Sequence, residues 1–410
     1  SLKFQKREKN NMRKKSLFNA TDFPSLMYPC FTFCRILGLC PYKINNSTFE
    51  TSKPHYILSI TATSALCVMH LIFLKYNKGF TKINFETATT SLEAYGFYIL
   101  FVFLTIGTLV LSNPRMRLLQ TIMDVSSRLS PKSYQKLSRL IHIKDIFGLF
   151  YVILLISIYF YKMSIDIMNI MSSTYAVLLI FQMDMLYINC ICVLKACFKD
   201  INSNLQHMQE LIVNSEPCAP MLFCYEQRNP FLIMKLKILK KQHMMISNTV
   251  QMLNRIFSVQ LLASMILTFC QISLHMYIYL IEWHDGLLVI SLNGRAGELI
   301  LLTMIYYIIK WALIAWACET CKNQAQEIRT TIHDVLNSAK DEQIKDELQS
   351  FSLQILHRKN IFSSKGFTID ATFLTTMVGT ITTYTLILLQ FLIISHSCDE
   401  NSTINITRIM

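Results

Sequence analysis

The sequence has 410 residues, of which 52% are hydrophobic and only 16% are charged, and its mean hydropathy is +0.36. Because ordinary soluble domains carry about 25% charged residues, this composition excludes a typical soluble protein and is typical of an integral membrane protein. A net charge of +13 would indicate a nucleic-acid partner if the basic residues covered a soluble fold. They lie instead between apolar runs, so we expect membrane lipid and no nucleic acid around this chain.

Long apolar segments recur along the chain and predict membrane-spanning helices. A hydrocarbon core of about 30 Å requires about 20 mostly apolar residues in a helix, and none of these segments alternates like a barrel strand. Seven segments qualify, in chain order: His55–Leu74, Ala94–Leu111, Ile146–Tyr161, Ser173–Leu194, Ile256–Ile281, Leu299–Ala317 and Ala371–Ile394. The third is short, the fourth contains Gln182 and Asp184, and the sixth contains Lys310, so six spans is the alternative count.

The distribution of basic residues tests this count. With seven spans, 32 of the 39 Lys and Arg residues fall on one side of the membrane and 6 on the other, while Lys310 lies within a span. The basic segments and the segments poor in basic residues alternate along the chain, and omitting a span would break this alternation. Since cytoplasmic segments carry the excess of basic residues, we predict an all-α, seven-transmembrane protein with a cytoplasmic N-terminus and an extracellular C-terminus.

The spans divide the chain into predicted parts. These are a cytoplasmic N-terminal segment (1–54), spans one to six with a long cytoplasmic loop at 195–255 (55–318), a cytoplasmic amphipathic region (319–370), span seven (371–394) and an extracellular tail (395–410). Possible N-glycosylation sites at Asn401 and Asn405 fall in this tail, which agrees with the predicted orientation.

The cytoplasmic stretch Glu319–Lys359 is amphipathic. Charged residues occupy 13 of its 41 positions. Its apolar residues include Ile328, Ile332, Val335, Ile344, Leu348, Phe351, Leu353 and Ile355. A solvated linker would not need these apolar positions, so we predict helix packed on a partner.

Signatures of catalysis and of metal binding are missing. The chain has no HExxH, GxSxG, P-loop or GxGxxG motif. Cys318 and Cys321 have CxxC spacing, but no matching second pair accompanies them, which favours a structural pair over a metal or redox site. We therefore predict no enzyme, no cofactor and no metal.

The predicted orientation also bears on the class of membrane protein. A G-protein-coupled receptor has the reverse orientation and typically carries DRY-like and NPxxY motifs, which this sequence lacks. A secondary transporter would usually show repeated halves with Gly- or Pro-interrupted helices, and we find no convincing repeat. A receptor or channel of inverted topology is favoured.

Span seven and its approach carry a family resemblance. The segment TYTLILLQF resembles the TYhhhhhQF signature of the insect gustatory receptor family, in which h is hydrophobic and Thr385 is the one polar departure. The motif residues are Thr383, Tyr384, Gln390 and Phe391. The preceding FSSKGFTIDATF is similar to that family's Gly-Phe-Phe…Asp stretch, with Thr368 in place of the second Phe. The specific similarity covers roughly the last hundred residues; the remainder agrees in length, span count and topology.

The resemblance implies a ligand-gated, nonselective cation channel in the plasma membrane of chemosensory neurons, opened by a small-molecule tastant. It would be a homotetramer, or a hetero-oligomer with related receptors, that passes monovalent and divalent cations. Span seven of each subunit would line one pore, and the cytoplasmic helices would join neighbouring subunits. The alternatives are a secondary transporter, which would show saturable coupled uptake, and a receptor that signals through a cytoplasmic partner.

One stripe of span seven is predicted to line the pore. Five residues recur on it at helical spacing: Thr380, Thr383, Ile387, Gln390 and Ile394. A stripe that mixes polar and apolar side chains suits a pore gated by dewetting at an apolar constriction, and the family comparison places the gate near Ile387 and Gln390. The alternative is that the hydroxyls and the amide hydrogen-bond between packed helices.

The outer halves of the spans contain candidates for ligand binding, because small ligands need an apolar cavity with a few placed polar groups. The candidates are Tyr98, Asp184, Gln271, His275 and Trp283. An interfacial aromatic belt is the alternative for the aromatic residues. Asp184 is costly at mid-membrane and is a functional candidate by default; its alternative is a structural acid that is protonated or paired with Lys310. The residues do not indicate whether the ligand is a sugar, a bitter compound or another molecule.

Overall fold

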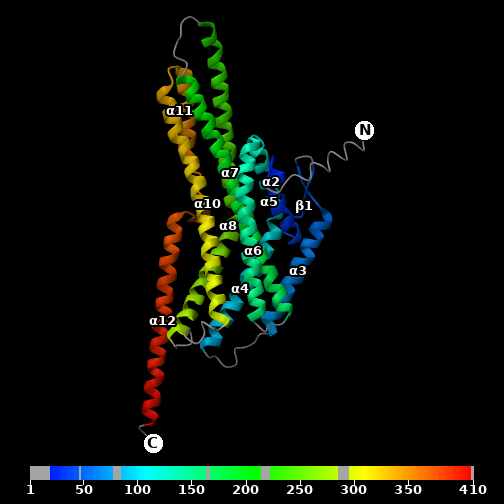
Figure 1. Ribbon diagram of the computed structural model, residues 1–410, viewed down its shortest axis with the longest axis vertical. Coiled ribbons are helices and arrows are strands. Elements are labelled where there is room, and N and C mark those ends of the chain that lie inside the picture. Colours follow the sequence, from blue (N-terminus) through cyan, green and yellow to red (C-terminus); the bar gives the residue numbers. More distant parts are fainter. Residues whose placement is uncertain are drawn as a thin grey trace.

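The computed structural model describes residues 19–45, 48–76, 85–162, 167–213, 222–284 and 295–407, without some side chains near helix ends, including those of 280–284 and 391–407. The helices are α2 (Phe23–Ile36), α3 (Lys53–Tyr76), α4 (Phe85–Val110), α5 (Ser112–Ser126), α6 (Pro131–Lys162), α7 (Ile167–Val213), α8 (Leu222–His284), α10 (Arg295–Ser338), α11 (Glu342–His357) and α12 (Ala371–Thr407) (Figure 1). Two antiparallel hairpins complete the described fold, β1 (Tyr42–Asn45) with β2 (Thr48–Thr51) and β3 (Ser363–Ser364) with β4 (Phe367–Thr368).

The predicted spans coincide with helices. Spans one to seven fall in α3, α4, α6, α7, α8, α10 and α12 in that order, with Leu111 one residue beyond α4. Among the described residues, α6, α7, α8, α10 and α12 are long and apolar enough to cross a membrane, and α4 with α5 is a sixth candidate bent by 61°. The bend has a local cause, because Pro114 lacks an N–H and its ring clashes with the carbonyl of Val110 in a continuous helix.

Residues 195–213 and 222–255, which belong to the predicted cytoplasmic connection between spans four and five, are helical. Helices α7 and α8 continue through most of this stretch and reach 47 and 63 residues. A helix of 47 residues is about 70 Å long, more than twice the thickness of a hydrocarbon core. Apolar residues at helical spacing, such as Leu205, Met208, Leu236 and Leu239, are buried along both extensions. The helices therefore extend beyond the spans as a packed bundle, at the top of Figure 1.

The predicted amphipathic stretch is helical and joins this bundle. It forms the end of α10 and the whole of α11, and the apolar residues named for it above are buried except for Leu353, which is 57% exposed; Leu356 is exposed as well. The partner is found within the same chain, since α10 packs on α7 and α11 packs on α8 and α10. Lys240 Nζ in α8 fixes α11 by donating to Ser350 Oγ at 2.6 Å and by pairing with Glu347 at 3.4 Å.

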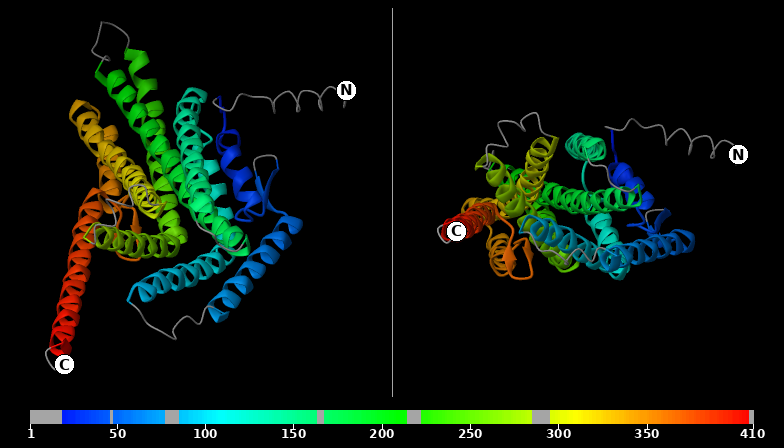
Figure 2. Two further views of the ribbon diagram at one scale, coloured as in Figure 1. Left: turned by 60° about the horizontal axis from the view of Figure 1, so that its bottom comes forward. Right: turned by 90° about the horizontal axis from the view of Figure 1, so that it is seen from below.

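Burial separates a central helix from peripheral ones. In its most apolar window, α7 is 89% buried, whereas the windows of α6 and α12 are only 6% and 11% buried. Helix α2, predicted to be cytoplasmic, packs beside α7: Gln182 Nε2 donates to the carbonyl of Cys30 at 3.1 Å, and the Tyr175 hydroxyl donates to that of Leu37 at 2.7 Å. The C-terminal half of α12 leans away from the other helices (Figure 2).

Candidate functional site

A short elbow sets the start of α12, the helix that holds the predicted pore segment. Gly366 has a φ of 99° in the turn of the β3–β4 hairpin, a conformation that glycine adopts without strain. Ser364 Oγ donates to the carbonyl of Ser258 in α8 over 2.6 Å and so attaches the hairpin to α8. Asp370 Oδ1 accepts a hydrogen bond from the N–H of Phe373 at 3.1 Å, which caps the first turn of α12.

The cap also ties α12 to α10. The hydroxyl of Thr372 and the N–H of Phe373 donate to Asp370 and hold its pKa below the ordinary value, and Lys322 of α10 contributes in the same direction from 3.9 Å. The ring of Phe373 lies 5.7 Å from that of Trp311, also in α10. Two contacts in the first turn therefore couple the position of α12 to α10.

The predicted pore stripe lies on an open face of α12. Thr383, Ile387 and Gln390 are exposed, and Thr380 is partly exposed. Thr380 Oγ1 donates to the carbonyl of Thr376 at 2.8 Å and Thr383 Oγ1 to that of Gly379 at 2.9 Å. The threonine hydroxyls therefore bond to their own helix, and their oxygen lone pairs stay available to water on the open face. The backbone of Ile394 is part of α12, but its side chain lies outside the described residues.

The other face of α12 packs against α8. Thr385, the polar departure from the motif, is 2% exposed, and its hydroxyl donates to the carbonyl of Ile381 at 2.8 Å. This internal bond satisfies the hydroxyl within the packed face. Tyr384 remains 51% exposed, and its ring meets that of Phe269 in α8 edge-on at 5.7 Å. The side chain of Phe391 lies outside the described residues.

A buried ion pair connects three helices at the level of the spans. Lys310 Nζ of α10 lies 3.2 Å from Asp184 Oδ2 of α7, and their side chains are 1% and 0% exposed. Lys310 also donates to Ser264 Oγ of α8 at 2.9 Å. Aromatic rings of Tyr307 and Trp311 lie 5.6 and 5.8 Å from the ammonium group. The sequence left two alternatives for Asp184, ligand binding and a structural pair with Lys310. The structure shows the pair with Lys310.

A small cavity adjoins this ion pair. Its volume is about 10 Å³, and its lining comes from α4, α7 and α8: Leu104, Thr108, Leu179, Ile180, Met183, Asp184, Gln260 and Ser264. Asp184 Oδ1 is buried and has no hydrogen-bond partner among the described residues. The space is about that of one water molecule, so a larger ligand would have to open it.

The other ligand-binding candidates are placed separately. Tyr98 of α4 is 7% exposed and hydrogen-bonds to Ser173, at the start of the fourth span. Gln271 is buried and His275 is half-buried one turn later on α8. The side chain of Trp283 lies outside the described residues. Of the predicted ligand-binding residues, Asp184 lines the small cavity described above.

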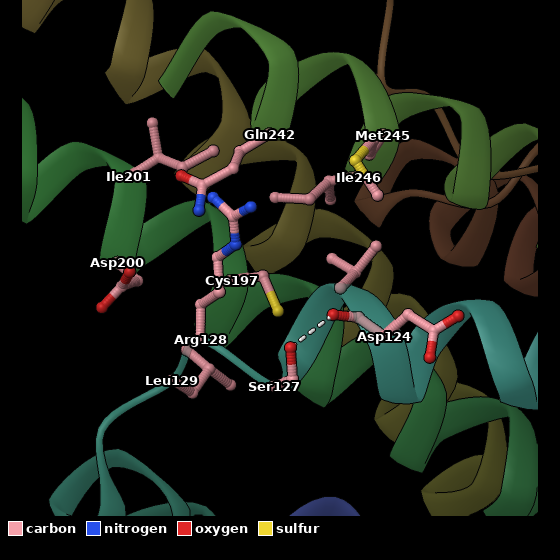
Figure 3. A pocket seen from close by; sticks show the side chains of 11 residues that line it. Asp124, Ser127, Arg128, Leu129, Cys197, Asp200, Ile201, Gln242, Met245 and Ile246 are labelled. Carbon is pink, nitrogen blue, oxygen red and sulfur yellow. Dashed lines mark hydrogen bonds between the residues drawn. The ribbon is translucent and has the colours of Figure 1, made fainter. Parts of the chain in front are cut away.

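Sequence reasoning missed a larger cavity of about 140 Å³ between α5, α7 and α8 (Figure 3). Arg128 points toward Gln242 across it, and with the Gln242 amide oriented to accept, Arg128 Nη1 donates to its oxygen at 2.6 Å. The thiol of Cys197 lies in the wall, and Asp124 and Asp200 stand at its edges. Because these residues are far apart in the sequence, no local motif marks this cavity.

Comparison with known proteins assigns the chain to a family. The profile of the 7tm chemosensory receptor family matches residues 27–394, most of the chain. Putative gustatory receptor 28b of Drosophila melanogaster is 37% identical over 89 residues, which cover 22% of this chain and 19% of that protein. Putative gustatory receptor 28a of the same species is 34% identical over 109 residues, or 26% and 24% of the two chains. The matches therefore span about a quarter or less of each curated relative.

Solved structures show the same fold. The insect olfactory receptor OR5 from Machilis hrabei superposes with a TM-score of 0.65 at 11% identity, over 89% of this chain and 97% of that one. The same receptor in complex with eugenol gives a TM-score of 0.64 at 13% identity with the same coverage. This chain belongs to the seven-transmembrane chemosensory receptor family, a family of receptors rather than enzymes, and is a homologue of insect gustatory receptors.

Proposed function

We propose that this chain is a subunit of a ligand-gated, nonselective cation channel, opened by a small-molecule tastant in the plasma membrane of a chemosensory neuron. The observation that carries the proposal is the asymmetry of α12. Ile381 and Thr385 are buried on one side of α12, whereas Thr383, Ile387 and Gln390 are among the residues of α12 that stay exposed in the single subunit. The threonine hydroxyls of the stripe bond within the helix, but an open stripe that also contains the Gln390 amide is poorly suited to lipid, since polar groups without partners are costly there. It suits a water-filled pore shared by several copies.

The gate in this proposal lies at Ile387 and Gln390. Ile387 is the first apolar position of the stripe, and its side chains from several subunits at one level would form an apolar ring that excludes water when closed. Gln390 follows about one turn later and offers donors and acceptors but no net charge. A pore lined by neutral polar groups discriminates weakly among cations, which supports a nonselective conductance.

Four copies arranged around α12 would complete the pore, as a homotetramer or together with related subunits. The elbow supports a mechanical link to the ligand, because α12 is held at its start by α10 and meets α8 through Tyr384 and Phe269. The same two helices contribute Lys310 and Ser264 to the ion pair beside the small cavity. A ligand among α4, α7 and α8 would therefore act on the helices that position the pore.

Patch-clamp recording from cells that express this chain tests the proposal. Ile387→Ala is compared with Val378→Ala, a matched control that is 64% exposed on another side of α12. We expect surface-expressed Ile387→Ala to raise the basal cation leak several-fold, since a smaller apolar ring is easier to wet. Val378→Ala should leave the leak unchanged. Gln390→Ala should alter rectification during perfusion of a sugar, bitter and nucleoside panel.

The two alternatives predict other results. A transporter would give saturable, substrate-coupled uptake without single-channel steps. A receptor that signals through a cytoplasmic partner would give currents that vanish when G-protein signalling is blocked. Equal leak in wild type, Ile387→Ala and Val378→Ala, with all three at the cell surface, would contradict the gate at Ile387.

A further inference from the structure

Helix α6 carries a basic stripe that nothing in the proposed channel function uses. Lys132, Lys136 and Arg139 are all exposed. At 100° per residue, the spacings of four and three place them on one side of the helix. The inner side is held by buried groups: the Tyr134 hydroxyl donates to the carbonyl of Ser126 at 2.6 Å, and the His142 ring bonds to that of Leu26 at 2.9 Å. The basic stripe therefore has a fixed outward direction.

The same side of α6 continues as an apolar, exposed surface. Ile143 and Ile146 are 50% and 48% exposed, and Phe147 and Phe150 are 72% and 67% exposed. These residues lie within or directly before the predicted third span, in the helix whose apolar window is only 6% buried. Helix α6 packs on α2, α7 and α10, which leaves this side free to meet lipid. One helix face thus changes from basic to apolar at the predicted cytoplasmic boundary.

The three basic side chains have no recorded counter-charge among the described residues. The contrast with Lys144 of the same helix is clear, because that side chain points inward, is 9% exposed and pairs with Asp145. Asp145 in turn accepts from Asn189 Nδ2 of α7 at 2.8 Å. Nearby acidic groups serve local structure: Asp22 caps α2, and Asp124 accepts from Gln120.

The basic stripe extends along the helix away from the membrane, and its length favours some anionic lipids over others. Seven residues separate Lys132 from Arg139, a rise of about 10 Å along the helix. The phosphates of singly charged lipids lie at one depth in the membrane. They can therefore pair only with the basic side chain nearest the membrane, Arg139. A headgroup that carries additional phosphates projects further into the cytoplasm and can meet charges at two levels. Basic clusters directly cytoplasmic of a span are the feature that attracts such lipids.

We propose that Lys132, Lys136 and Arg139 form a binding site for the headgroup of a phosphoinositide in the cytoplasmic leaflet, whose acyl chains lie along Ile143, Phe147 and Phe150. The site does not depend on the channel proposal. It would fix α6, and through it α2 and α7, to the inner face of the membrane.

The test uses the purified full chain in phosphatidylcholine nanodiscs and a fluorescent short-chain phosphatidylinositol bisphosphate, followed by anisotropy. The triple variant Lys132→Ala, Lys136→Ala, Arg139→Ala is compared with Lys241→Ala, Arg329→Ala, Lys340→Ala, which removes the same charge from exposed positions elsewhere. Each basic group near an anionic surface contributes about a factor of five. We therefore expect about a 100-fold loss of affinity in the α6 variant and less than a twofold change in the control.

Two further arms define the ligand. Lys132→Arg, Lys136→Arg, Arg139→Lys keeps the charge and should keep the affinity, and the alanine variant should retain the melting temperature of the wild type, so that its loss of affinity reflects the lost charge and not a failure to fold. Short-chain phosphatidylserine and free inositol trisphosphate should both compete weakly. Equal losses in the two alanine variants would overturn the site, equal competition by phosphatidylserine would overturn the choice of headgroup, and equal competition by free inositol trisphosphate would overturn the membrane lipid as its ligand.

Discussion

Lys310 of α10 and Asp184 of α7 lie 3.2 Å apart with almost no exposure, each within a predicted span. The hydroxyl of Ser264 from α8 bonds to the ammonium group, so one pair of charges joins three helices. Desolvating two charges is expensive, and the pair offsets this cost only while both partners are present. The energetic consequence of removing one partner therefore differs sharply from that of removing both.

Asp184→Asn should destabilise the protein by about 3–5 kcal/mol, because it leaves the Lys310 ammonium buried without a counter-charge. Lys310→Met should cost a similar amount. The double variant Asp184→Leu, Lys310→Met should recover most of the stability, since it buries no charge. Thermal unfolding followed by size-exclusion chromatography measures all three. A double variant as unstable as either single variant would show that the pair does not account for the loss.

Asp370→Ala should lower stability by about 1 kcal/mol through loss of the cap on α12. Hydrogen bonds from Thr372 and Phe373 lower the pKa of Asp370, so its ionised form stabilises the fold. This contribution is present above the unfolded pKa of about 3.9 and is lost as the pH falls through the still lower folded pKa. The difference in melting temperature between wild type and Asp370→Asn should thus be unchanged from pH 8 to pH 5 and shrink below about pH 4. A difference that shrinks already near neutral pH would contradict this cap.

Phe351→Ala should destabilise the α8–α11 contact by about 3–5 kcal/mol, because it opens a cavity in the packed bundle. Phe351 is 0% exposed and packs edge-on against His243 of α8, with ring centroids 5.6 Å apart. Leu353, two residues later and 57% exposed, is the matched control. Leu353→Ala should change the stability of the isolated subunit by less than about 0.5 kcal/mol. Hydrogen exchange of the α11 amides measures the effect of each substitution. Equal protection in Phe351→Ala and Leu353→Ala would contradict the packing described.

Gly148→Ala should destabilise the contact between α6 and α7 by about 1–3 kcal/mol. A Cβ at Gly148 would lie 2.8 Å from the ring of Phe181, whereas a Cβ at Gly107 of α4 would meet nothing within 4 Å. Gly107→Ala should therefore be neutral or stabilising by up to about 1 kcal/mol, because alanine favours helix. Melting temperatures of the two variants in the same detergent test this pair, and a larger loss at Gly107 would contradict the predicted order.

The sequence was sufficient for the features that depend on local pattern. Apolar runs marked helices that contain the predicted spans, since each helix must satisfy its backbone internally in lipid. The motif in span seven indicated the family that the profile over residues 27–394 then showed. Helical spacing grouped Thr383, Ile387 and Gln390 on one side of span seven.

Other features depended on contacts between distant residues. Within the predicted cytoplasmic connection 195–255, residues 195–213 and 222–255 are helical, and apolar positions of α7 and α8 are buried there. The amphipathic stretch packs on helices of its own chain, and Leu353 faces outward. The cavity with Arg128 and Gln242 brings together three helices that no local motif connects.

The sequence by itself determined that this chain is a helical membrane protein with the family motif in its last span, because hydrophobicity and spacing are properties of a single helix. Only the tertiary structure decided that Asp184 meets Lys310 and that α12 keeps an open face. These outcomes depend on which helices pack together and at what rotation. Side chains more than a hundred residues apart set that packing jointly.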